Sequence, residues 1–341
     1  MASTLHDMQF KASLADPDVW MRPAVKASGE KYYEYIFVYV DDILVVSEKP
    51  AVTMDTIGKA YRLKEGSVGP PTQYLGAQIK PHRFDDMPGS VFWSMGSARY
   101  VKEAVHNLEL GYRPELDMSP LLDAAHTNFY QQQIGISRWA VELGRTELHC
   151  SVALLAQYLV APRQGHLNQV YRMFAYLKAH DRSQIVLDAS RPKVDESRFH
   201  QADWHEFYHD AQEAIPPNAP EAHGNSVIMS CFCDADHAGN KVTRRSLTGI
   251  LIFVNRAPII WFSKRQNTVY TSTFGSEFVA ARIAVELIEG LRYKLQMFGV
   301  PIDGPKSMYI DNESVVLNST HPESALKKSI TPSPIIEYVK Q

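Results

Sequence analysis

The sequence has few cysteines and no long apolar run, and these two shortages exclude several classes of protein. Three cysteines in 341 residues are too few for a disulfide framework or a four-cysteine zinc site. No apolar run approaches the roughly 20 residues needed to cross a bilayer. The N-terminus, MASTLHDMQFKASLADPDVW, lacks the apolar core of a signal peptide. We therefore expect an intracellular protein in a reducing compartment, with no membrane partner; cytoplasm and nucleus fit equally.

Two of the cysteines are spaced in a way that could suggest a metal site. Cys231 and Cys233 flank Phe232 within an apolar run. Alternate residues of such a run are more simply the buried face of a strand. We expect a strand here and no zinc site.

Acidic and basic residues nearly balance, and the net charge of −3 by itself favours no partner. Their distribution is uneven. Residues 227–328 hold twelve Lys or Arg against nine Asp or Glu, a net charge of +3, which leaves −6 for the remainder. A mildly basic C-terminal third in an acidic chain is compatible with a polyanion such as nucleic acid. The length predicts two or three domains.

The first half of the chain predicts a strand hairpin followed by helices. Two β-rich runs, YIFVYV and ILVVS, flank Asp41-Asp42 and predict two strands joined by a tight turn. Helical periodicity over 146–160 and 166–179 predicts a helical hairpin. The other elements expected in this half are helices over 51–63 and 97–108, a strand over 74–79 and a loop over 80–92.

The second half predicts a mixed sheet. Residues 191–226 contain proline and seven acidic residues without a regular period, which is typical of a linker with a boundary near Gly224. Beyond it we expect strands over 226–233, 247–255 and 259–263 (with a turn at Arg256-Ala-Pro258), a helix over 274–298, a strand over 307–310 and a short helix from Asn312. A right-handed crossover would place the fourth strand beside the first.

Three acidic residues of this unit are expected to meet at one edge of the sheet. Asp234 ends the first strand and Asp311 ends the fourth, so parallel pairing brings both carboxylates to the same edge. Glu277 lies one turn into the long helix and can point back to that edge. Like charges raise one another's pKa, and divalent cations relieve the repulsion. Such ligands favour Mg²⁺ or Mn²⁺, and two ions roughly 4 Å apart suit phosphodiester cleavage.

Four segments of this unit resemble the ribonuclease H domain of copia-type LTR retrotransposons: CDADHAGN, RRSLTGILIFVNRAPIIWFSKRQ, STFGSEFVAA and YIDNESVV. The resemblance implies catalytic and metal-binding roles for Asp234, Glu277 and Asp311, with Asp236 as a weaker candidate. It implies Mg²⁺ or Mn²⁺ in a two-metal site. Each acid taken alone is more often an ordinary strand-end or helix-start residue, so the hypothesis depends on their joint arrangement.

The C-terminal tail departs from the family pattern, which closes with a His-rich helix that supplies a fourth carboxylate. Here the tail reads LKKSITPSPIIEYVKQ, in which Pro332 and Pro334 interrupt any helix. Glu337 is a poor substitute for the missing acid. We therefore expect weak nuclease activity on an intact fold.

The N-terminal part resembles the reverse transcriptase of the same elements. Tyr39-Val40-Asp41-Asp42 is similar to the YVDD motif, with ADPDVW before it and YLGAQI after it in family positions. The resemblance implies polymerase-type metal binding by Asp41 and Asp42. Their partner acid belongs to a segment ahead of this one in the family, so we expect both to be vestigial. An Asp-Asp turn alone is nearly always structural.

The resemblance covers residues 10–326 and predicts the architecture. We expect an α/β and α+β fold, with a truncated reverse-transcriptase palm and thumb followed by a ribonuclease H-like mixed sheet with flanking helices. The expected divisions are a partial palm with the YVDD hairpin over 1–92, a thumb- or connection-like helical region over 93–190, a linker over 191–225 and a ribonuclease H-like domain over 226–341.

Basic residues at strand ends and turns are candidates for phosphate contacts: Arg244, Arg245, Lys264 and Arg265. Solvated turn charges are an equally good account of them. The expected partners are an RNA–DNA hybrid or a template–primer duplex, together with other parts of a Pol polyprotein. Trp139 and Trp261 are expected to be core residues and not platforms for stacked bases.

Three functions are compatible with the sequence. The first is metal-dependent cleavage of the RNA strand of an RNA–DNA hybrid, as part of a retrotransposon polyprotein. The second is an inactive remnant that at most binds nucleic acid, with polymerase activity lost by truncation. The third is a transposase or integrase of related fold. The short spacing from Asp234 to Glu277 to Asp311, and the YVDD segment upstream, disfavour the third.

Overall fold

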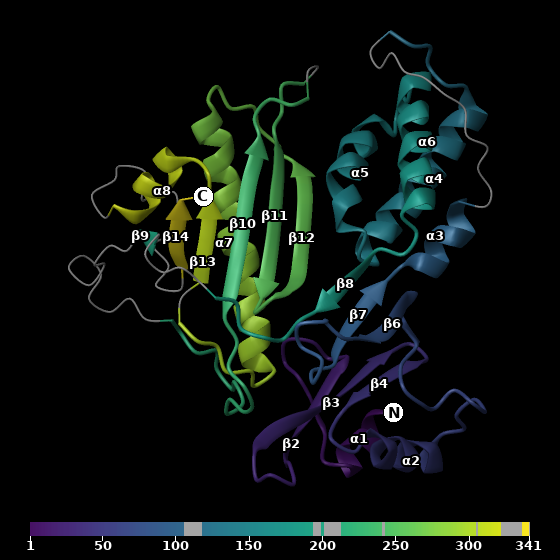
Figure 1. The fold of residues 1–341 in the computed structure, drawn as a ribbon, viewed down its shortest axis with the longest axis vertical. Helices are drawn as coiled ribbons and strands as arrows, with labels where there is room; N and C mark the ends of the chain where they lie inside the picture. The colour runs from purple at the N-terminus through teal and green to yellow at the C-terminus, as the bar shows by residue number, and fades with distance from the viewer. Residues whose placement is uncertain are drawn as a thin grey trace.

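The fold is that of a computed structural model, which describes residues 1–105, 118–193, 199–200, 213–240, 243–304, 306–321 and 336–340. These residues form three sheets with helices packed against them (Figure 1). The expectation of a mixed α/β protein is confirmed. Within these ranges no helix is both long and apolar enough to span a membrane.

The N-terminal sheet is antiparallel and contains the Asp-Asp hairpin. Its strands, in order across the sheet, are β1 (Lys11–Ala12), β2 (Val19–Val25), β3 (Lys31–Tyr39) and β4 (Asp42–Val46). Helices α1 (Ala2–Asp7) and α2 (Pro50–Ala60) contribute Leu5 and Ile57 to a core with Trp20 and Ile36. The predicted hairpin and helix are confirmed, but the turn consists of Val40 and Asp41, because Asp42 already pairs with Tyr39. α1, β1 and β2 were not expected from the sequence.

The second sheet crosses the expected division at residue 92. Its strands, in order, are β5 (Gln73–Tyr74), β6 (Ala77–His82), β7 (Phe92–Gly96) and β8 (Gln184–Leu187). The single strand expected over 74–79 is a hairpin, because Leu75 and Gly76 both have positive φ angles and form a tight two-residue turn. β8 returns from beyond the helices to pair with β7, so residues 1–92 and 93–190 share a sheet.

Helices α3 (Ala98–Val105), α4 (Ala124–Glu142), α5 (His149–Leu155) and α6 (Gln164–Ala179) form a bundle between β7 and β8. The helix expected over 146–160 is shorter, since 3₁₀ turns at Thr146–Leu148 and Ala156–Tyr158 flank α5. Residues 106–108 of the helix expected over 97–108 lie outside the described residues. Trp261 packs on this bundle as expected, but Trp139 is 46% exposed and is not a core residue.

The C-terminal sheet has six strands in the order β12-β11-β10-β13-β14-β9. They are β9 (Phe199–His200), β10 (Met229–Asp236), β11 (Leu247–Val254), β12 (Ala257–Arg265), β13 (Lys306–Ile310) and β14 (Ile336–Lys340). β10, β13 and β14 are parallel, as the crossover argument predicted for the first two. The turn between β11 and β12 is Asn255-Arg256 and not Arg256-Ala-Pro258, because Asn255 adopts the left-handed conformation and Ala257 already pairs with Val254.

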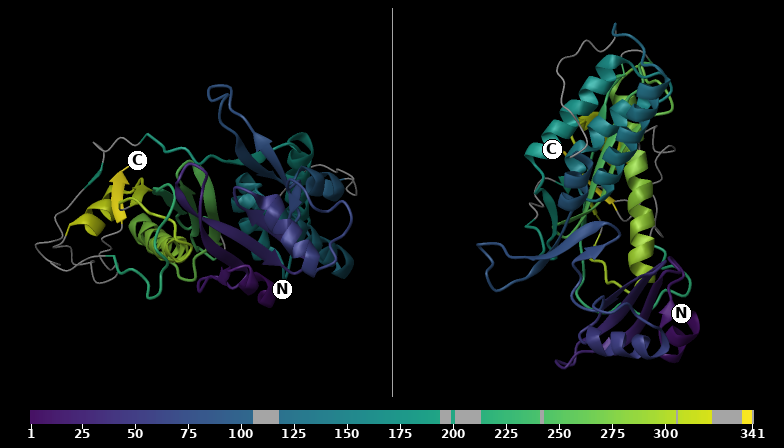
Figure 2. Two further views of the ribbon diagram at one scale, coloured as in Figure 1. Left: turned by 90° about the horizontal axis from the view of Figure 1, so that it is seen from below. Right: turned by 90° about the vertical axis from the view of Figure 1, so that its right-hand side faces the viewer.

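Helices cover both faces of this sheet. α7 (Thr273–Met297) packs on one face over Cys231, Cys233 and Ile250, in a core that α8 (Glu313–Thr320) completes. Both cysteines are buried and Phe232 between them is 38% exposed, so the strand-face interpretation is confirmed. On the opposite face, α5 lies against β12, and Trp261 Nε1 donates to the Val141 carbonyl at 3.1 Å. The C-terminal end of α7 reaches the N-terminal sheet (Figure 2).

The described parts of 191–225 are bound to the rest of the protein, unlike a free linker. β9 pairs with β14 at the edge of the sheet. Glu213 accepts hydrogen bonds from Arg292 Nε at 2.6 Å and from Gln296 at 2.9 Å. Polar partners within the fold therefore replace the solvent exposure that the proline and acidic content indicated.

Candidate metal centre

Strand pairing brings two of the three predicted acids to one edge of the six-stranded sheet. β10 and β13 are parallel, with Phe232 opposite Tyr309. Asp234 and Asp311 each follow two residues later, at the C-terminal ends of neighbouring strands. On the other flank, β11 places Gly249 opposite Asp234, which leaves space beside the carboxylate because glycine has no side chain.

The start of α7 supplies the third acid. Ser272 caps the helix, and its Oγ accepts a hydrogen bond from the Gly275 N–H at 3.3 Å. Glu277 follows in the second turn and is only 6% exposed. A carboxylate oxygen from each of Asp234, Glu277 and Asp311 lies within 4.8 Å of the other two. The prediction that these three carboxylates converge is confirmed.

The environment of Glu277 disfavours its charged form. Burial, the largest cause, together with the nearby Asp234 and Asp311 carboxylates, raises the pKa of Glu277 to about 8. Asp234 is held in place by a hydrogen bond to Oδ1 from the Ala235 N–H at 2.7 Å. At neutral pH the cluster therefore retains a proton on Glu277, since ionising all three acids would place like charges together.

The donor set fits a divalent cation. Glu277 Oε2 is buried and has no hydrogen-bond partner among the described residues. A buried oxygen without a partner costs free energy, and a cation bound to it would remove that cost. Three carboxylates around open coordination positions are the hard oxygen ligands that Mg²⁺ and Mn²⁺ prefer.

Asp236 does not join this cluster. Its side chain lies against Gly239 in the turn that follows β10, so closely that a Cβ at residue 239 would collide with the carboxylate. The group of metal-capable side chains in the described part of the chain contains Asp234, Glu277 and Asp311 without it. Its position agrees with its rank as the weaker candidate.

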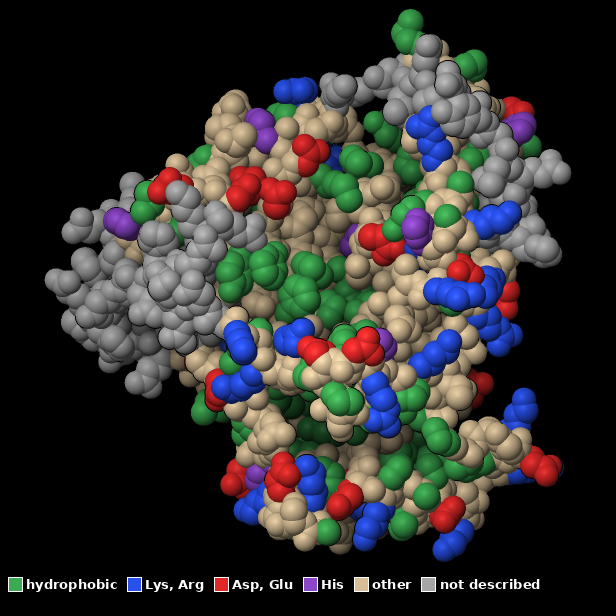
Figure 3. Space-filling model, viewed as in Figure 1, with side chains coloured by type: hydrophobic (Ala, Val, Ile, Leu, Met, Phe, Trp, Pro, Cys, Tyr) green, Lys and Arg blue, Asp and Glu red, His purple; other side chains and the backbone are tan. Residues whose placement is uncertain are grey.

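The predicted basic residues lie at the same edge of the sheet as the acids. Leu247 pairs with Asp236 on one side and with Arg265 on the other, which brings the end of β12 level with the end of β10. Arg244 and Arg245 lie in the connection between β10 and β11, where Arg244 has a positive φ angle. Figure 3 shows Lys, Arg, Asp and Glu side chains scattered over the face of the molecule seen in Figure 1, with hydrophobic side chains exposed between them.

A buried polar network behind the acids escaped the sequence analysis. Gln266 Nε2 donates to Thr248 Oγ1 at 3.0 Å and to the Ser276 carbonyl at 2.9 Å. Ser276 precedes Glu277, and its Oγ lies 3.2 Å from His237 Nδ1. The network joins β11, β12, α7 and the turn after β10, so it fixes the base of the cluster. Gln266 follows a strand directly, which is the one sequence signal that could have identified it.

The Asp-Asp hairpin forms a separate site. Tyr39 pairs with Asp42, so Val40 and Asp41 are the turn residues, and Val40 has a positive φ angle that is unusual for a β-branched side chain. Tyr74 lies nearby: burial first, then the charges of Asp42 and Asp18, raise its pKa. Neither Asp41 nor Asp42 belongs to a group of three metal-capable side chains within the described ranges.

The described part of the C-terminal tail is a strand, which was not expected from the sequence. Its β-rich segment, residues 336–340, forms β14 and extends the sheet parallel to β13. Glu337 pairs with Ser307, whereas Lys340 pairs with Ile310 beside Asp311. The backbone of Glu337 therefore lies three residues before the acid-bearing edge. Pro332 and Pro334 lie outside the described residues.

Comparison with known proteins identifies retroelement relatives at low identity. The chain is 23% identical over 256 residues to a transposon Ty5-1 protein of Saccharomyces cerevisiae, covering 72% of this chain and 71% of that protein. It is 25% identical to an uncharacterized mitochondrial protein of Arabidopsis thaliana, covering 74% of this chain and 92% of that protein. No family model matches the chain, and no solved structure matches it.

A third relative is the Pol polyprotein of transposon RE1 from Arabidopsis thaliana, which is 21% identical over 291 residues. The match covers 82% of this chain but only 17% of the polyprotein, so the chain spans about a sixth of that relative's length. These relatives confirm the predicted resemblance to a copia-type retrotransposon Pol fragment.

Proposed function

We propose that the chain is a metal-dependent, ribonuclease H-type nuclease that cuts the RNA strand of RNA–DNA hybrids within a retrotransposon reverse-transcription polyprotein. The observation that carries the proposal is the convergence of Asp234, Glu277 and Asp311 within 4.8 Å. The strand order β12-β11-β10-β13-β14, with the last three parallel, supports a ribonuclease H-like sheet for residues 226–341. The retroelement relatives support the setting.

The residues of the chain have distinct parts in this proposal. Asp234 and Asp311 would hold cations from the sheet, and Glu277 would do so from the helix after releasing its proton. Bound Mg²⁺ or Mn²⁺ would supply Lewis acidity at the scissile phosphate. Arg244 and Arg245 would contact phosphates beside the cut. A metal site of this kind would cut without reading the base sequence. The A-form shape of the hybrid and the 2′-hydroxyl groups would therefore identify the RNA strand.

The N-terminal regions are assigned in the same proposal to a partial reverse-transcriptase palm, residues 1–92, and to a thumb- or connection-like unit, residues 93–190. The exposed Asp41 and Asp42 hairpin supports the palm assignment. Among the described residues this hairpin has no third metal-capable side chain beside it, which supports treating its acids as vestigial in this proposal.

Cleavage of a labelled RNA–DNA hybrid tests the nuclease proposal. We expect weak metal-dependent activity that is higher in Mn²⁺, because Mg²⁺ demands near-ideal octahedral geometry and only three carboxylates converge in the described part of the chain. Asp234→Asn and Asp311→Asn should each lower the rate by at least about a hundredfold, more than the loss of an outer-sphere residue.

Glu289→Gln is the matched control. Glu289 is an exposed carboxylate on α7, away from the cluster, and its variant should cleave like the wild type. Equal cleavage by the wild type and Asp234→Asn would point to a contaminating nuclease and contradict the proposal.

Nucleic-acid binding without cleavage is the second candidate function. The cluster of three carboxylates among the described residues favours this function, since the family pattern has a fourth carboxylate in its metal site. Hybrid binding by a well-folded wild type that shows no cleavage in either metal would establish this alternative.

A further inference from the structure

A cationic groove adjoins the acid cluster on the α7 face of the sheet. It lies between the end of β12 and the second and third turns of α7 and has a volume of about 420 Å³. That is within the roughly 300–1,000 Å³ of typical ligand sites. Among the described residues, three cationic side chains and no carboxylate line it, with Phe262, Val279 and Ile283 as its apolar part.

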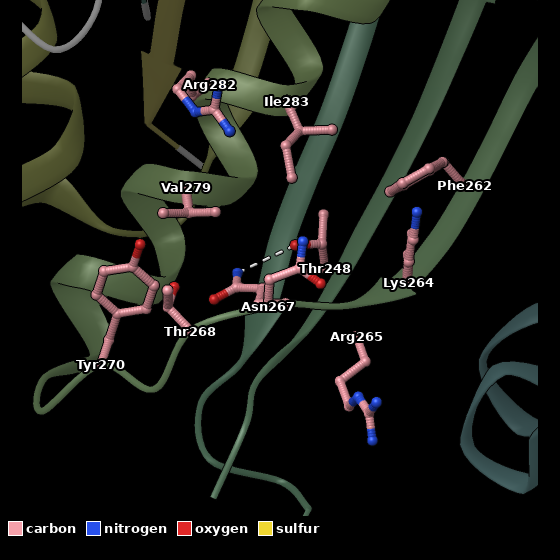
Figure 4. A pocket seen from close by; sticks show the side chains of 11 residues that line it. Thr248, Phe262, Lys264, Arg265, Asn267, Thr268, Tyr270, Val279, Arg282 and Ile283 are labelled. Atoms are coloured by element: carbon pink, nitrogen blue, oxygen red, sulfur yellow. Dashed lines mark hydrogen bonds between the residues drawn. The ribbon is translucent and has the colours of Figure 1, made fainter. Parts of the chain in front are cut away.

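The cations are placed on opposite sides of this groove. Figure 4 shows Lys264 on the β12 side and Arg282 on the α7 side, while Arg265 extends away from both. Arg282 is exposed and pairs with Glu286, the next helical turn along, which does not line the groove. Both Lys264 and Arg282 are therefore accessible to an anion that enters between them.

A buried side chain links the groove to the segment that carries Glu277. Gln266 lines the groove, is 4% exposed, and donates to the carbonyl of Ser276, the residue before Glu277. An anion bound in the groove would therefore lie beside the segment that carries Glu277. Because the whole chain carries a net charge of −3, a polyanion needs local cations to approach the acid cluster.

We propose that this groove is a subsite for the phosphodiester backbone of the nucleic acid, outside the cut position. Lys264 and Arg282 contact phosphates from its two sides, and the apolar wall contacts the sugars between them. This inference rests on the proposed function, because it takes the nuclease substrate as the ligand. The inference adds Arg282 to the phosphate-contacting residues, which the sequence did not indicate. It assigns a phosphate contact to Lys264 but not to Arg265, whose side chain extends away.

Binding measured without cleavage tests the subsite. Labelled RNA–DNA hybrid is titrated with wild type, Lys264→Gln, Arg282→Gln and the double variant in EDTA, between about 50 and 200 mM salt. We expect each single variant to bind several-fold more weakly. The slope of log affinity against log salt should fall by about one for each phosphate contact removed.

Lys294→Gln is the matched control, because Lys294 is an exposed lysine near the other end of α7. It should bind with wild-type affinity and slope. Unchanged binding in both groove variants, or an equal loss in Lys294→Gln, overturns the subsite. Thermal melting of every variant shows that a loss of affinity is not a loss of fold.

Two further arms identify the ligand. If inorganic phosphate or a mononucleotide binds wild type but not Lys264→Gln while hybrid binding is unchanged, the groove holds a small phosphate and the proposal is overturned. Failure of the nuclease assay with groove-dependent hybrid binding contradicts the proposed function alone, so the two outcomes are distinguishable.

Discussion

Glu277 is the residue whose protonation decides the charge of the acid cluster. Its pKa is raised to about 8, mainly by burial, from an ordinary value of 4.5. Between these values the folded state holds one proton more than the unfolded state. The contribution of Glu277 to the free energy of unfolding of the metal-free protein therefore falls as pH rises through this window, by an amount on the order of a few kcal/mol.

We predict that Glu277→Gln removes most of this pH dependence, because an amide carries no titrating proton. Thermal melting in EDTA at pH 5, 6.5 and 8 measures it. Wild type should melt at progressively lower temperature, and the variant should change much less. Mg²⁺ added at pH 8 should raise the melting temperature of wild type more than that of Glu277→Gln. A wild-type melting temperature that rises from pH 5 to 8 would contradict the assigned pKa direction.

The convergence of the three acids was predictable residue by residue, and the groove beside them was not. Asp234 and Asp311 directly follow strand-forming runs, and parallel pairing then fixes them at one edge. Arg282 is an exposed charge on a long amphipathic helix, and nothing in its local sequence indicates that it faces β12. Its placement depends on how α7 packs, which is a tertiary property.

At the scale of elements, α7 links the acid cluster to the N-terminal sheet. Its first turns carry Glu277, and at its other end the Phe298 carbonyl accepts a hydrogen bond from the Tyr35 hydroxyl at 2.7 Å. Between these ends Arg292, which is 4% exposed, pairs with Glu213 and donates to the Gly304 carbonyl at 3.2 Å. α7 is therefore held by the N-terminal sheet, through Tyr35, and by Glu213 and Gly304 on either side of it in the sequence.

We predict that Glu213→Ala destabilises the protein by on the order of 2–3 kcal/mol, because it leaves the Arg292 guanidinium buried without its carboxylate. The Glu213 side chain is itself 27% exposed, so the loss of stability should be smaller than for a fully buried ion pair. Replacing both residues, as in Glu213→Ala with Arg292→Met, should recover part of the loss. Urea unfolding of the three proteins measures the difference.

Glu30→Ala is the control for that prediction. Glu30 pairs with Lys26 at 2.8 Å, and their side chains are 41% and 36% exposed. Loss of an exposed pair should cost less than about 1 kcal/mol. If the two glutamate variants lose equal stability, the buried position of Arg292 is not what makes its pair important.

Elements with regular apolar periods were predicted from sequence, and those with polar residues in the core were missed. α4 buries Gln133 and Ser137, and the Ser137 hydroxyl donates to the Gln133 carbonyl at 2.8 Å. These two polar positions interrupt the apolar stripe that identifies a helix. β14 was missed because its partner β13 lies far away in sequence, and short strands are specified by such partners more than by propensity.

At the scale of the whole molecule, the two sets of acids lie in different sheets. The C-terminal end of β10, which carries Asp234, points away from the sheet that contains β3 and β4 (Figure 1). The Asp41-Asp42 hairpin belongs to that sheet. The two sets share no strand or helix, although α7, which carries Glu277, contacts β3 through the Tyr35 hydroxyl.

We predict that neither wild type nor the double variant Asp41→Asn, Asp42→Asn incorporates nucleotides on a primed template, in Mg²⁺ or Mn²⁺. The reason is that polymerisation requires a pair of ions, and these two exposed acids have no third metal-capable side chain beside them among the described residues. The same double variant should cleave an RNA–DNA hybrid at the wild-type rate, whereas Asp234→Asn should not cleave it. Primer extension and hybrid cleavage on one set of protein preparations measure both activities.

Metal-dependent incorporation that disappears in the double variant would show that the hairpin is an active site. Slower hybrid cleavage by a well-folded double variant would instead show that the two sets of acids act on a shared substrate.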